Sequence, residues 1–503
     1  MNCCPSEKQC VLGFDEFGFA VFRRHCDRWK QQHRSHEYSY PSVSTFKIEL
    51  WQEMFRNWNE TDGSCTNKIH RFLESGVPTA LRGQLWKCLL GSERVKESSI
   101  HTYQDYVQEL RSQLSTLGVN EYGVQMAVST LDGAHKVRAG MAGGTRNLAP
   151  AQEPEVKIET LRQIVLDVER SFPTHCSLMG RSAEAKEGQA KLFRILSAYA
   201  EYNPQIGYCQ GMSYIAAMLL MNMQEQDAFW ALVVLLEKPK YLAGFYEHSL
   251  DTIQRHAKIF QQLLKHRMPC LWQHMENLKV APLLFITTWF LTLFTSLPCW
   301  DTVLAIWDLI ILYGINTIFS TGLCILQLLE PRLLAMSDVS HLLPTLLRIP
   351  VEVSRYSILV PALWMTKVHK WELDCMQSVV LEEEEEEMMS SGRHSIQSST
   401  MQKATNVDKK NAPNLKDDAG KRSSRSSAST GRGRQETLKN TLTKMLKIAR
   451  CYLQELGQLP KDLATSPSQD RSPSARGHTK YHGSKGEARR VNSRRGRTER
   501  TNL

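Results

Sequence analysis

The spacing of apolar residues limits this chain to one fold class. From Gly76 to about Met376 they recur at the spacing of amphipathic α-helices, and Gly or Pro separates stretches of roughly ten to twenty residues. No alternating strand pattern of any length appears in the sequence. We therefore predict an all-α protein with a single large helical domain over residues 76–376. Its clearest apolar stripes are Ile158, Leu161, Ile164, Val165 and Val168, and then Leu192, Phe193, Leu196 and Tyr199.

Positive charge is concentrated behind this region. The chain of 503 residues has a formal net charge of +10, while residues 402–503 contain 24 Lys and Arg against 9 Asp and Glu. The rest is slightly acidic, so the basic character belongs to the tail. Ser, Lys, Arg and Gly dominate there, which predicts a disordered basic C-terminal tail. Solvated disorder is favoured over contact with RNA, membrane phosphates or an import receptor, so nucleic acid is not an expected partner.

Changes in composition divide the chain into segments. The segments before and within the helical region are an N-terminal arm, 1–75, expected to pack on the domain, and a flexible loop at about 117–154 that is rich in small residues. The segments behind it are an acidic run with a disordered linker, 377–434, a candidate amphipathic helix, 435–457, and the disordered basic tail, 458–503.

The candidate amphipathic helix leaves two interpretations open. Within 436–456 leucines recur at helical spacing, lysines occupy other positions, and Gly457 and Pro460 provide a stop. Such a helix can bind an acidic membrane surface or a calmodulin-like partner. It can equally pack back on the domain.

The cysteines and the longest apolar run indicate the cellular compartment and whether the chain crosses a membrane. The 13 cysteines are scattered, with no C-x-x-C pair and no Cys/His set at zinc spacing. We therefore expect a reduced, cytoplasmic protein without a metal site, and peripheral contact with endomembranes stays open. The nearly apolar run 281–294 is shorter than the roughly 20 residues of a membrane span, so we predict a buried helix and no transmembrane segment.

The first motif, residues 76–86, combines a turn with the start of a helix. Arg82 and Trp86 lie four residues apart and so share one helix face. We expect the Arg82 stem to pack against Trp86 and close the helix end, which is a structural role.

The second motif places an arginine at the end of a helix. Pro154 can open this helix and Pro173 marks where it must have stopped, so Arg170 lies near its surface end. Asp167 precedes Arg170 by one turn, at the spacing where a carboxylate can direct a guanidinium group. From periodicity alone, an ordinary surface ion pair is the simpler interpretation.

The third motif places a glutamine on a short turn. One helix ends before Pro204, and another begins near Met212 and continues to Met221. Tyr208 and Gln210 lie on the Gly-flanked segment between them, where Gln210 can point to a partner. A helix cap or a bond to its own backbone is the alternative for Gln210.

Together and in this order, the three motifs resemble the TBC domain, the helical domain of Rab GTPase-activating proteins. Its signatures are an Arg and a Trp four apart, Ile-x-x-Asp-x-x-Arg, and Tyr-x-Gln. The resemblance covers about residues 76–333. The matching residues are Arg82 with Trp86, Ile164 with Asp167 and Arg170, and Tyr208 with Gln210.

The resemblance implies a mechanism in trans on a Rab-family GTPase. Arg170 would be the arginine finger that neutralises charge developing on the phosphate, and Gln210 the glutamine finger that orients the attacking water. Asp167 would aim Arg170, Tyr208 would wedge the glutamine loop, and the first motif would be structural. GTP and magnesium would come with the partner, so no cofactor and no nucleotide or hydrolase site of its own is expected.

The chain departs from the family's pattern at several positions. Ser171 stands where Thr is common, and Ala305 stands where the family usually has Arg. The loop at 117–154 is also long for its place. Because Ala305 could remove an ion pair or loosen partner contact, the alternative function is a Rab-binding scaffold or effector with little or no activating effect.

Overall fold

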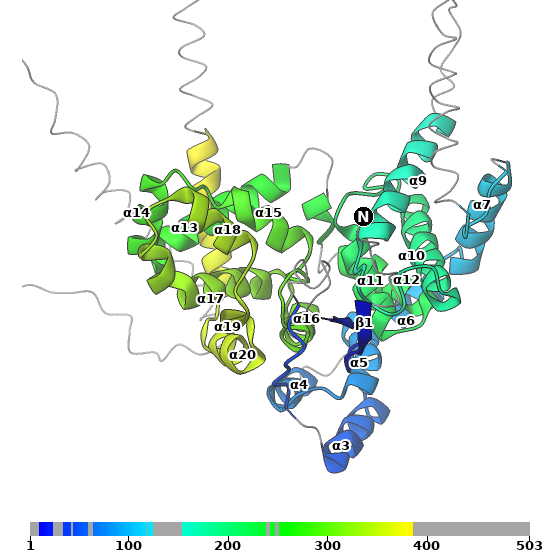
Figure 1. Cartoon of the computed structure of the whole chain (residues 1–503), viewed down its shortest axis with the longest axis horizontal. Coiled ribbons are helices and arrows are strands. Elements are labelled where there is room, and N and C mark those ends of the chain that lie inside the picture. The colour runs from blue at the N-terminus through cyan, green and yellow to red at the C-terminus, as the bar shows by residue number, and fades with distance from the viewer. Residues whose placement is uncertain are drawn as a thin grey trace, which may run out of the picture. The chain divides into compact units, whose positions relative to one another are not determined.

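The computed structural model describes much of the chain up to residue 385. The described ranges are 10–23, 34–41, 44–58, 64–116, 118–123, 153–237, 242–246 and 251–385 (Figure 1). The predicted candidate amphipathic helix at 435–457 and basic tail at 458–503 lie outside these residues, as does most of the predicted loop at 117–154.

Helices make up most of the described residues, and the predicted all-α class is confirmed. Before the undescribed part of the loop, the helices are α3 (Thr45–Arg56), α4 (Ser64–Glu74), η1 (Thr79–Leu81), α5 (Arg82–Leu90), α6 (Ser92–Ser98) and α7 (Tyr103–Thr116). After it come α9 (Glu153–Arg170), α10 (Ala183–Tyr202), α11 (Met212–Asn222), α12 (Glu225–Leu236), η2 (Leu242–Tyr246), α13 (Asp251–Arg267), α14 (Pro269–Asn277) and α15 (Leu283–Leu291). The last are α16 (Trp300–Tyr313), α17 (Ile315–Leu334), α18 (Val339–Leu347), α19 (Val351–Ser354), α20 (Tyr356–Met365) and a helix at 370–385.

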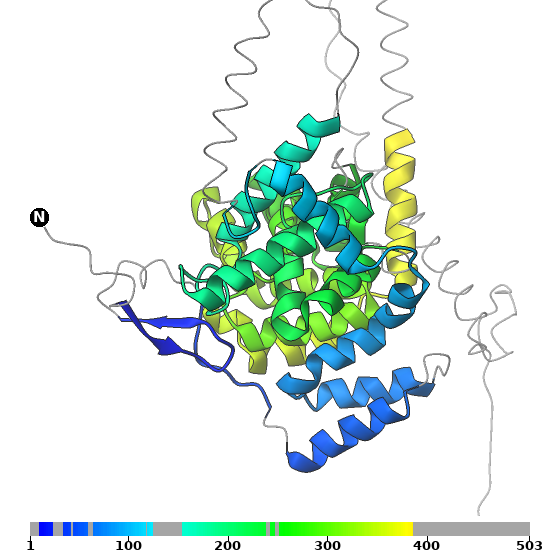
Figure 2. The ribbon, with the colours of Figure 1, turned by 90° about the vertical axis from the view of Figure 1, so that its right-hand side faces the viewer.

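A small antiparallel hairpin is an exception to the helical pattern. Strand β1 (Val11–Phe14) pairs with β2 (Ala20–Phe22), and the hairpin lies along one edge of the helical body (Figure 2). Strands this short cannot show an alternating pattern, so the sequence did not predict them. In the described part of the arm, Phe19 and Trp51 are both fully buried.

The helices that carry the candidate site pack around α10 and α16. Helix α10 contacts α7, α9, α11 and α12, whereas α16 contacts α5, α17 and α20. Helices α12 and α16 are buried along most of their length because neighbours cover several of their faces. The tryptophans Trp86, Trp230, Trp289 and Trp307 are each at most 1% exposed, so large rings fill much of this core.

The helical part extends beyond the boundary that composition suggested. We placed a disordered linker from residue 377, but residues 370–385 form one helix. Cys375, Met376 and Val380 are buried in the core, and Lys258 on α13 donates a 3.0 Å hydrogen bond to Glu384. The glutamates that read as a linker therefore lie partly on a helix that packs against α13.

The apolar run 281–294 forms α15, as predicted, but it is only partly buried. Phe285 and Phe290 are fully buried, while Leu284 is 50% exposed. Among the described residues, no helix combines the length and the apolarity that a membrane span needs.

Candidate functional site

Arg82 and Trp86 meet at a shared buried carboxylate. Arg82 is fully buried on α5, and its Nε donates to Asp308 Oδ1 at 3.1 Å. Trp86 Nε1 donates to the same oxygen at 2.7 Å. Arg82 Nη2 also donates to the hydroxyl of Tyr40 at 2.8 Å. These contacts tie α5 to α16 and to the N-terminal arm, so this arginine stabilises the fold.

Burial and charge act in opposite directions on this pair. Burial disfavours the charged guanidinium, but the adjacent Asp308 raises the pKa of Arg82 above its ordinary value. Arg82 therefore stays charged inside the core, where removing either partner would leave an uncompensated charge.

The second motif has a different geometry. Helix α9 ends at Arg170, whose side chain is 50% exposed and forms an ion pair with Asp167 Oδ1. The other oxygen of Asp167, Oδ2, accepts a hydrogen bond from the Tyr208 hydroxyl. The Asp167 side chain is only 6% exposed. One buried carboxylate thus holds an exposed arginine on one side and the glutamine segment on the other.

Tyr208 is held at a buried position between the two motifs. It is buried, and its burial together with its hydrogen bond to Asp167 raises the pKa of the phenol. The neutral hydroxyl can therefore donate to the carboxylate across the whole physiological pH range. The structure gives Tyr208 a connecting role between the two motifs that the sequence did not predict.

A second buried contact joins the same two segments. The hydroxyl groups of Ser171 and Ser213 lie 2.7 Å apart, and both side chains are fully buried. Ser171 Oγ donates to the carbonyl of Asp167 at 2.7 Å. Because that bond uses the only proton of Ser171, Ser213 is the donor between the two hydroxyls. The end of α9 is thus held against the start of α11.

Gln210 lies on a tight turn with its side chain exposed. Gly207 and Gly211 flank it with φ values of +61° and +107°, which glycine adopts without strain. Gly211 also leaves no room for a side chain, because a Cβ there would lie 3.0 Å from the carbonyl of Leu291. The turn is therefore fixed by backbone packing, and α11 begins two residues after Gln210, as predicted.

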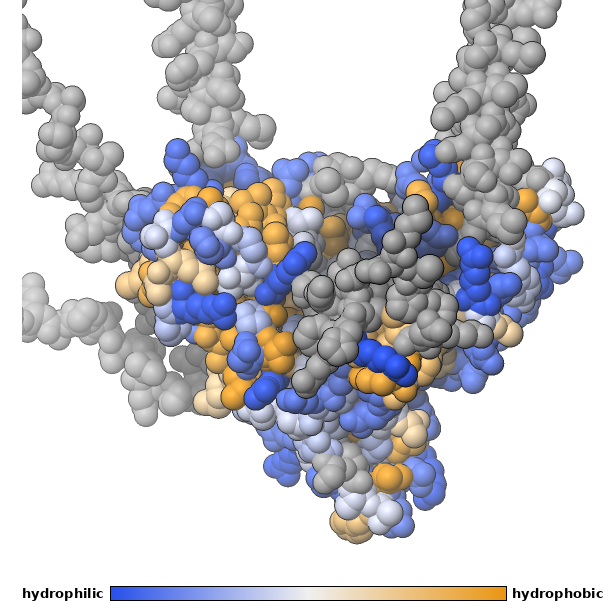
Figure 3. All heavy atoms as spheres, viewed as in Figure 1, coloured by the Kyte–Doolittle hydropathy of each residue, from blue (hydrophilic) through white to orange (hydrophobic). Residues whose placement is uncertain are grey.

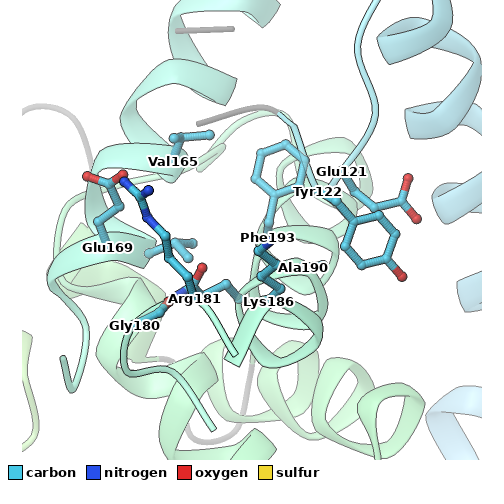
Figure 4. A pocket seen from close by; sticks show the side chains of 11 residues that line it. Glu121, Tyr122, Val165, Glu169, Gly180, Arg181, Lys186, Ala190 and Phe193 are labelled. Atoms are coloured by element: carbon cyan, nitrogen blue, oxygen red, sulfur yellow. Dashed lines mark hydrogen bonds between the residues drawn. The ribbon is translucent and has the colours of Figure 1, made fainter. Parts of the chain in front are cut away.

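A pocket of about 400 Å³ lies nearby but does not include these side chains. Figure 4 shows Glu169 of α9 and Arg181 pointing toward one another at this pocket, with Phe193 of α10 on its wall. Neither Arg170 nor Gln210 lines it. In the described part of the chain, no cluster of His, Cys, Asp and Glu could hold a metal ion. The candidate site is therefore a pair of exposed polar side chains on a surface.

Sequence reasoning missed several residues that organise this surface. Asp308, Ser213 and Tyr214 are three of them, and nothing in their spacing indicated their partners. The Tyr214 hydroxyl donates to the carbonyl of Arg170 at 3.4 Å. Ala305, for which the sequence left a lost ion pair or a looser partner contact open, is buried beside Tyr356.

The fold and this surface define a class of protein, namely a helical domain that presents one arginine and one glutamine outward from a rigid support. Comparison with known proteins gives the family. Residues 147–334 match the family model of the Rab-GTPase-TBC domain. This match confirms, over these residues, the resemblance to the TBC family seen in the sequence.

Individual relatives agree with this match. The chain is 30% identical over 279 residues to Carabin of Mus musculus, covering 55% of this chain and 51% of that protein. It is 31% identical over 277 residues to TBC1 domain family member 10A of Mus musculus, covering 55% of this chain and 45% of the relative. This chain thus spans about half the length of these curated relatives.

Two solved structures can be aligned with part of the chain. The crystal structure of the Ypt/Rab-GAP domain of Gyp1p aligns with a TM-score of 0.45 at 19% identity, covering 66% of this chain and 99% of that one. A Chlamydomonas flagellar RabGAP TBC domain aligns with a TM-score of 0.44 at 23% identity, covering 63% of this chain and 90% of that one.

Proposed function

We propose that this protein activates a Rab-family small GTPase by supplying Arg170 and Gln210 in trans. One observation carries the proposal above all others. The buried Asp167 is bound at once by Arg170 and by Tyr208, two residues before Gln210. The side chains of Arg170 and Gln210 are exposed, while Asp167 and Tyr208, which support them, are buried.

The chemistry of GTP hydrolysis matches these two side chains. Negative charge spreads over the phosphoryl oxygens in the transition state, and a guanidinium group from outside can neutralise it. Such an arginine contributes roughly a thousand- to a hundred-thousand-fold in rate, or about 4 to 7 kcal/mol of barrier. Gln210 would orient the attacking water with its amide. GTP and magnesium would belong to the partner.

The surroundings of Gln210 favour a protein partner. Helix α15 ends at Leu291, which packs against Gly211, and its other end exposes Leu283 and Leu284. Apolar side chains gather on the surface over α15 and α18 (Figure 3), and these helices are in contact. Exposed apolar residues beside a polar site are typical of a surface that binds another protein.

The cellular role follows from the partner. Hydrolysis returns a Rab protein to its GDP-bound form, so we propose that this protein limits Rab signalling in vesicle trafficking, from the cytoplasm or from the surface of endomembranes.

The test uses purified full-length protein and a panel of GTP-loaded Rab proteins. Phosphate release should accelerate for at least one Rab, and Arg170→Ala should abolish this effect without changing the melting temperature. Lack of acceleration for every Rab would contradict the proposal. Equal binding of a Rab by wild type and Arg170→Ala without turnover would instead indicate the scaffold function, which Ala305 first raised.

The position of Ala305 gives little support to the scaffold alternative. Ala305 is 9% exposed and packs with Tyr356 and Val360 in a small apolar cluster of α16 and α20. Its methyl group thus fills space inside the protein instead of offering a contact to a partner.

A further inference from the structure

We infer that the N-terminal hairpin, residues 10–23, is a positioning element for Arg170 and acts through the turn that follows it, residues 171–179. This inference rests on the proposed function, because positioning matters only if Arg170 works on a partner. The hairpin lies outside the residues 147–334 that match the family model.

The hairpin is bonded directly to this turn. The amide of Ala20 donates to the carbonyl of Thr174 at 2.8 Å, and the amide of Cys176 donates to the carbonyl of Gly18 at 2.8 Å. His175 Nε2 lies 3.0 Å from the carbonyl of Phe17. Since a carbonyl only accepts, this ring nitrogen carries the proton. The turn therefore gains three hydrogen bonds from a segment far away in the sequence.

The turn needs external support because its backbone is strained. Phe172, two residues after Arg170, has φ +46°, in the left-handed region that a bulky residue rarely adopts. Such a conformation persists only where the surrounding structure over-determines it. Without the hairpin, Phe172 could relax to a negative φ, which would turn the chain that leads away from Arg170.

Packed aromatic rings connect the hairpin with Arg170. Phe19 is fully buried, and its ring centroid lies 6.3 Å from that of Phe172. The Phe172 ring contacts Tyr214 at 5.4 Å, and the Tyr214 hydroxyl donates to the carbonyl of Arg170. The Arg34 guanidinium stacks over the Phe19 ring, 4.0 Å from its centroid. The path from hairpin to Arg170 is thus a continuous set of packed side chains.

Hydrogen bonds to Asp15 fix the shape of the hairpin loop. Asp15 Oδ1 accepts from the amides of Phe17 and Phe19, at 3.0 and 2.8 Å. Its other oxygen accepts from the Tyr38 hydroxyl at 2.5 Å and lies 2.7 Å from His36 Nδ1. The loop between the strands is therefore held rigid, and Gly18 and Phe19 are presented to the turn in one fixed geometry.

Two substitutions in the full-length protein separate positioning from mere stability. Phe19→Ala removes the hairpin's ring from the group packed against Phe172, in which the Trp300 ring, at 5.3 Å, remains. Gly18→Ala places a Cβ 2.7 Å from His175 Nε2 at φ +86°, which pushes the hairpin off the turn. Phe14→Ala is the matched control, because that ring is on the same hairpin and is 49% exposed. Phe19→Leu keeps apolar volume and should give an intermediate result.

The first measurement is hydrogen–deuterium exchange of peptides spanning residues 167–179. Phe19→Ala and Gly18→Ala should speed exchange there, while Phe14→Ala should match wild type. Wild-type protection in both hairpin variants would overturn the inference. This readout needs no GTPase, so it decides whether the hairpin holds the turn even if no Rab is activated and the proposed function fails.

The second measurement is GTP hydrolysis by the responsive Rab, with kcat and KM determined separately. Small misplacement of a catalytic group can cost roughly a hundredfold in rate, so Phe19→Ala should lower kcat about 10- to 100-fold and change KM by less than about twofold. Leu333→Ala, at a fully buried position on α17, controls for general destabilisation and should keep kcat. An unchanged kcat in both hairpin variants would contradict the inference.

Discussion

Two arginine–aspartate pairs in this protein are built from the same groups for opposite purposes. Arg82 and Asp308 join helices more than two hundred positions apart, and both side chains are at most 4% exposed. Arg170 and Asp167 lie one turn apart, with the arginine 50% exposed and the aspartate 6%. In the first pair both charged groups are buried in the core. In the second pair only the carboxylate is buried.

The difference shows how a charged group becomes available for work. An aspartate buried beneath an exposed arginine fixes the direction of the guanidinium group while leaving its other N–H donors free for a partner. A buried arginine such as Arg82 donates hydrogen bonds to other groups of the same protein and cannot reach a partner. Exposure of the arginine therefore distinguishes a stabilising pair from a candidate catalytic pair, and the following predictions test that distinction.

Arg170→Ala should give the largest effect on activity and almost none on stability. We expect loss of about 4 to 7 kcal/mol of transition-state stabilisation in the activated GTPase. The free energy of unfolding should change by less than about 1 kcal/mol, as is usual for an exposed ion pair. Phosphate-release kinetics and urea denaturation check the two values. A large loss of stability would mean that this pair is structural after all.

Arg82→Ala should show the reverse. It leaves Asp308 buried without its cation, so the free energy of unfolding should fall by about 3 to 5 kcal/mol. Protein that stays folded, isolated by gel filtration, should keep its activating rate per molecule. Chemical denaturation gives the first value. Normal stability in this variant would contradict the buried role assigned to Arg82.

Acid should loosen the Arg170 side of the molecule. Burial, with a smaller contribution from the nearby Arg34, lowers the pKa of His175 from 6.5 to about 4, although the hydrogen bond to the Phe17 carbonyl and the charge of Asp15 oppose this. The unfolded chain therefore binds a proton before the folded protein does. The contribution of neutral His175 to the free energy of unfolding is fully present above pH 6.5. Roughly 3 kcal/mol is lost as the pH falls toward 4.

Unfolding free energies of wild type and His175→Gln across this pH range measure the effect. The difference between the two slopes isolates His175 from other groups, since Gln does not titrate. Parallel curves would show that His175 is not responsible.

Tyr208→Phe should give the smallest effect. It removes one hydrogen bond to the Asp167 carboxylate and keeps the ring. We expect about 1.5 kcal/mol of lost activation, or roughly tenfold in kcat. Stopped-flow phosphate release measures it. Unchanged kcat would indicate that Arg170 alone keeps Asp167 in place.

Much of the fold and of the candidate site could be predicted from the sequence because the signals were local. Helical spacing located α9 and its buried stripe, and the glycines around Gln210 indicated a stiff turn. Pro173 correctly marked the end of the helix, which closes at Arg170. These features depend on residues within one or two turns of each other.

The remaining features depend on contacts between distant segments. Nothing near Arg82 identifies Asp308 as its partner, and nothing near Arg170 indicates that Phe19 supports the turn behind it. The strands of the hairpin are too short for periodicity to detect. The acidic run resembled a linker because its described glutamates, 382–385, are mostly exposed, and the partners of Glu383 and Glu384 lie far away in the sequence on α13.

The most direct test of the central claim uses a responsive Rab whose own catalytic glutamine has been replaced by leucine. If Gln210 supplies the water-orienting amide, wild-type protein will still accelerate GTP hydrolysis by this Rab, and Gln210→Ala will accelerate neither it nor the unmodified Rab. The account is contradicted if the leucine-substituted Rab is not activated by the wild-type protein, or if Gln210→Ala activates the unmodified Rab as well as wild type does.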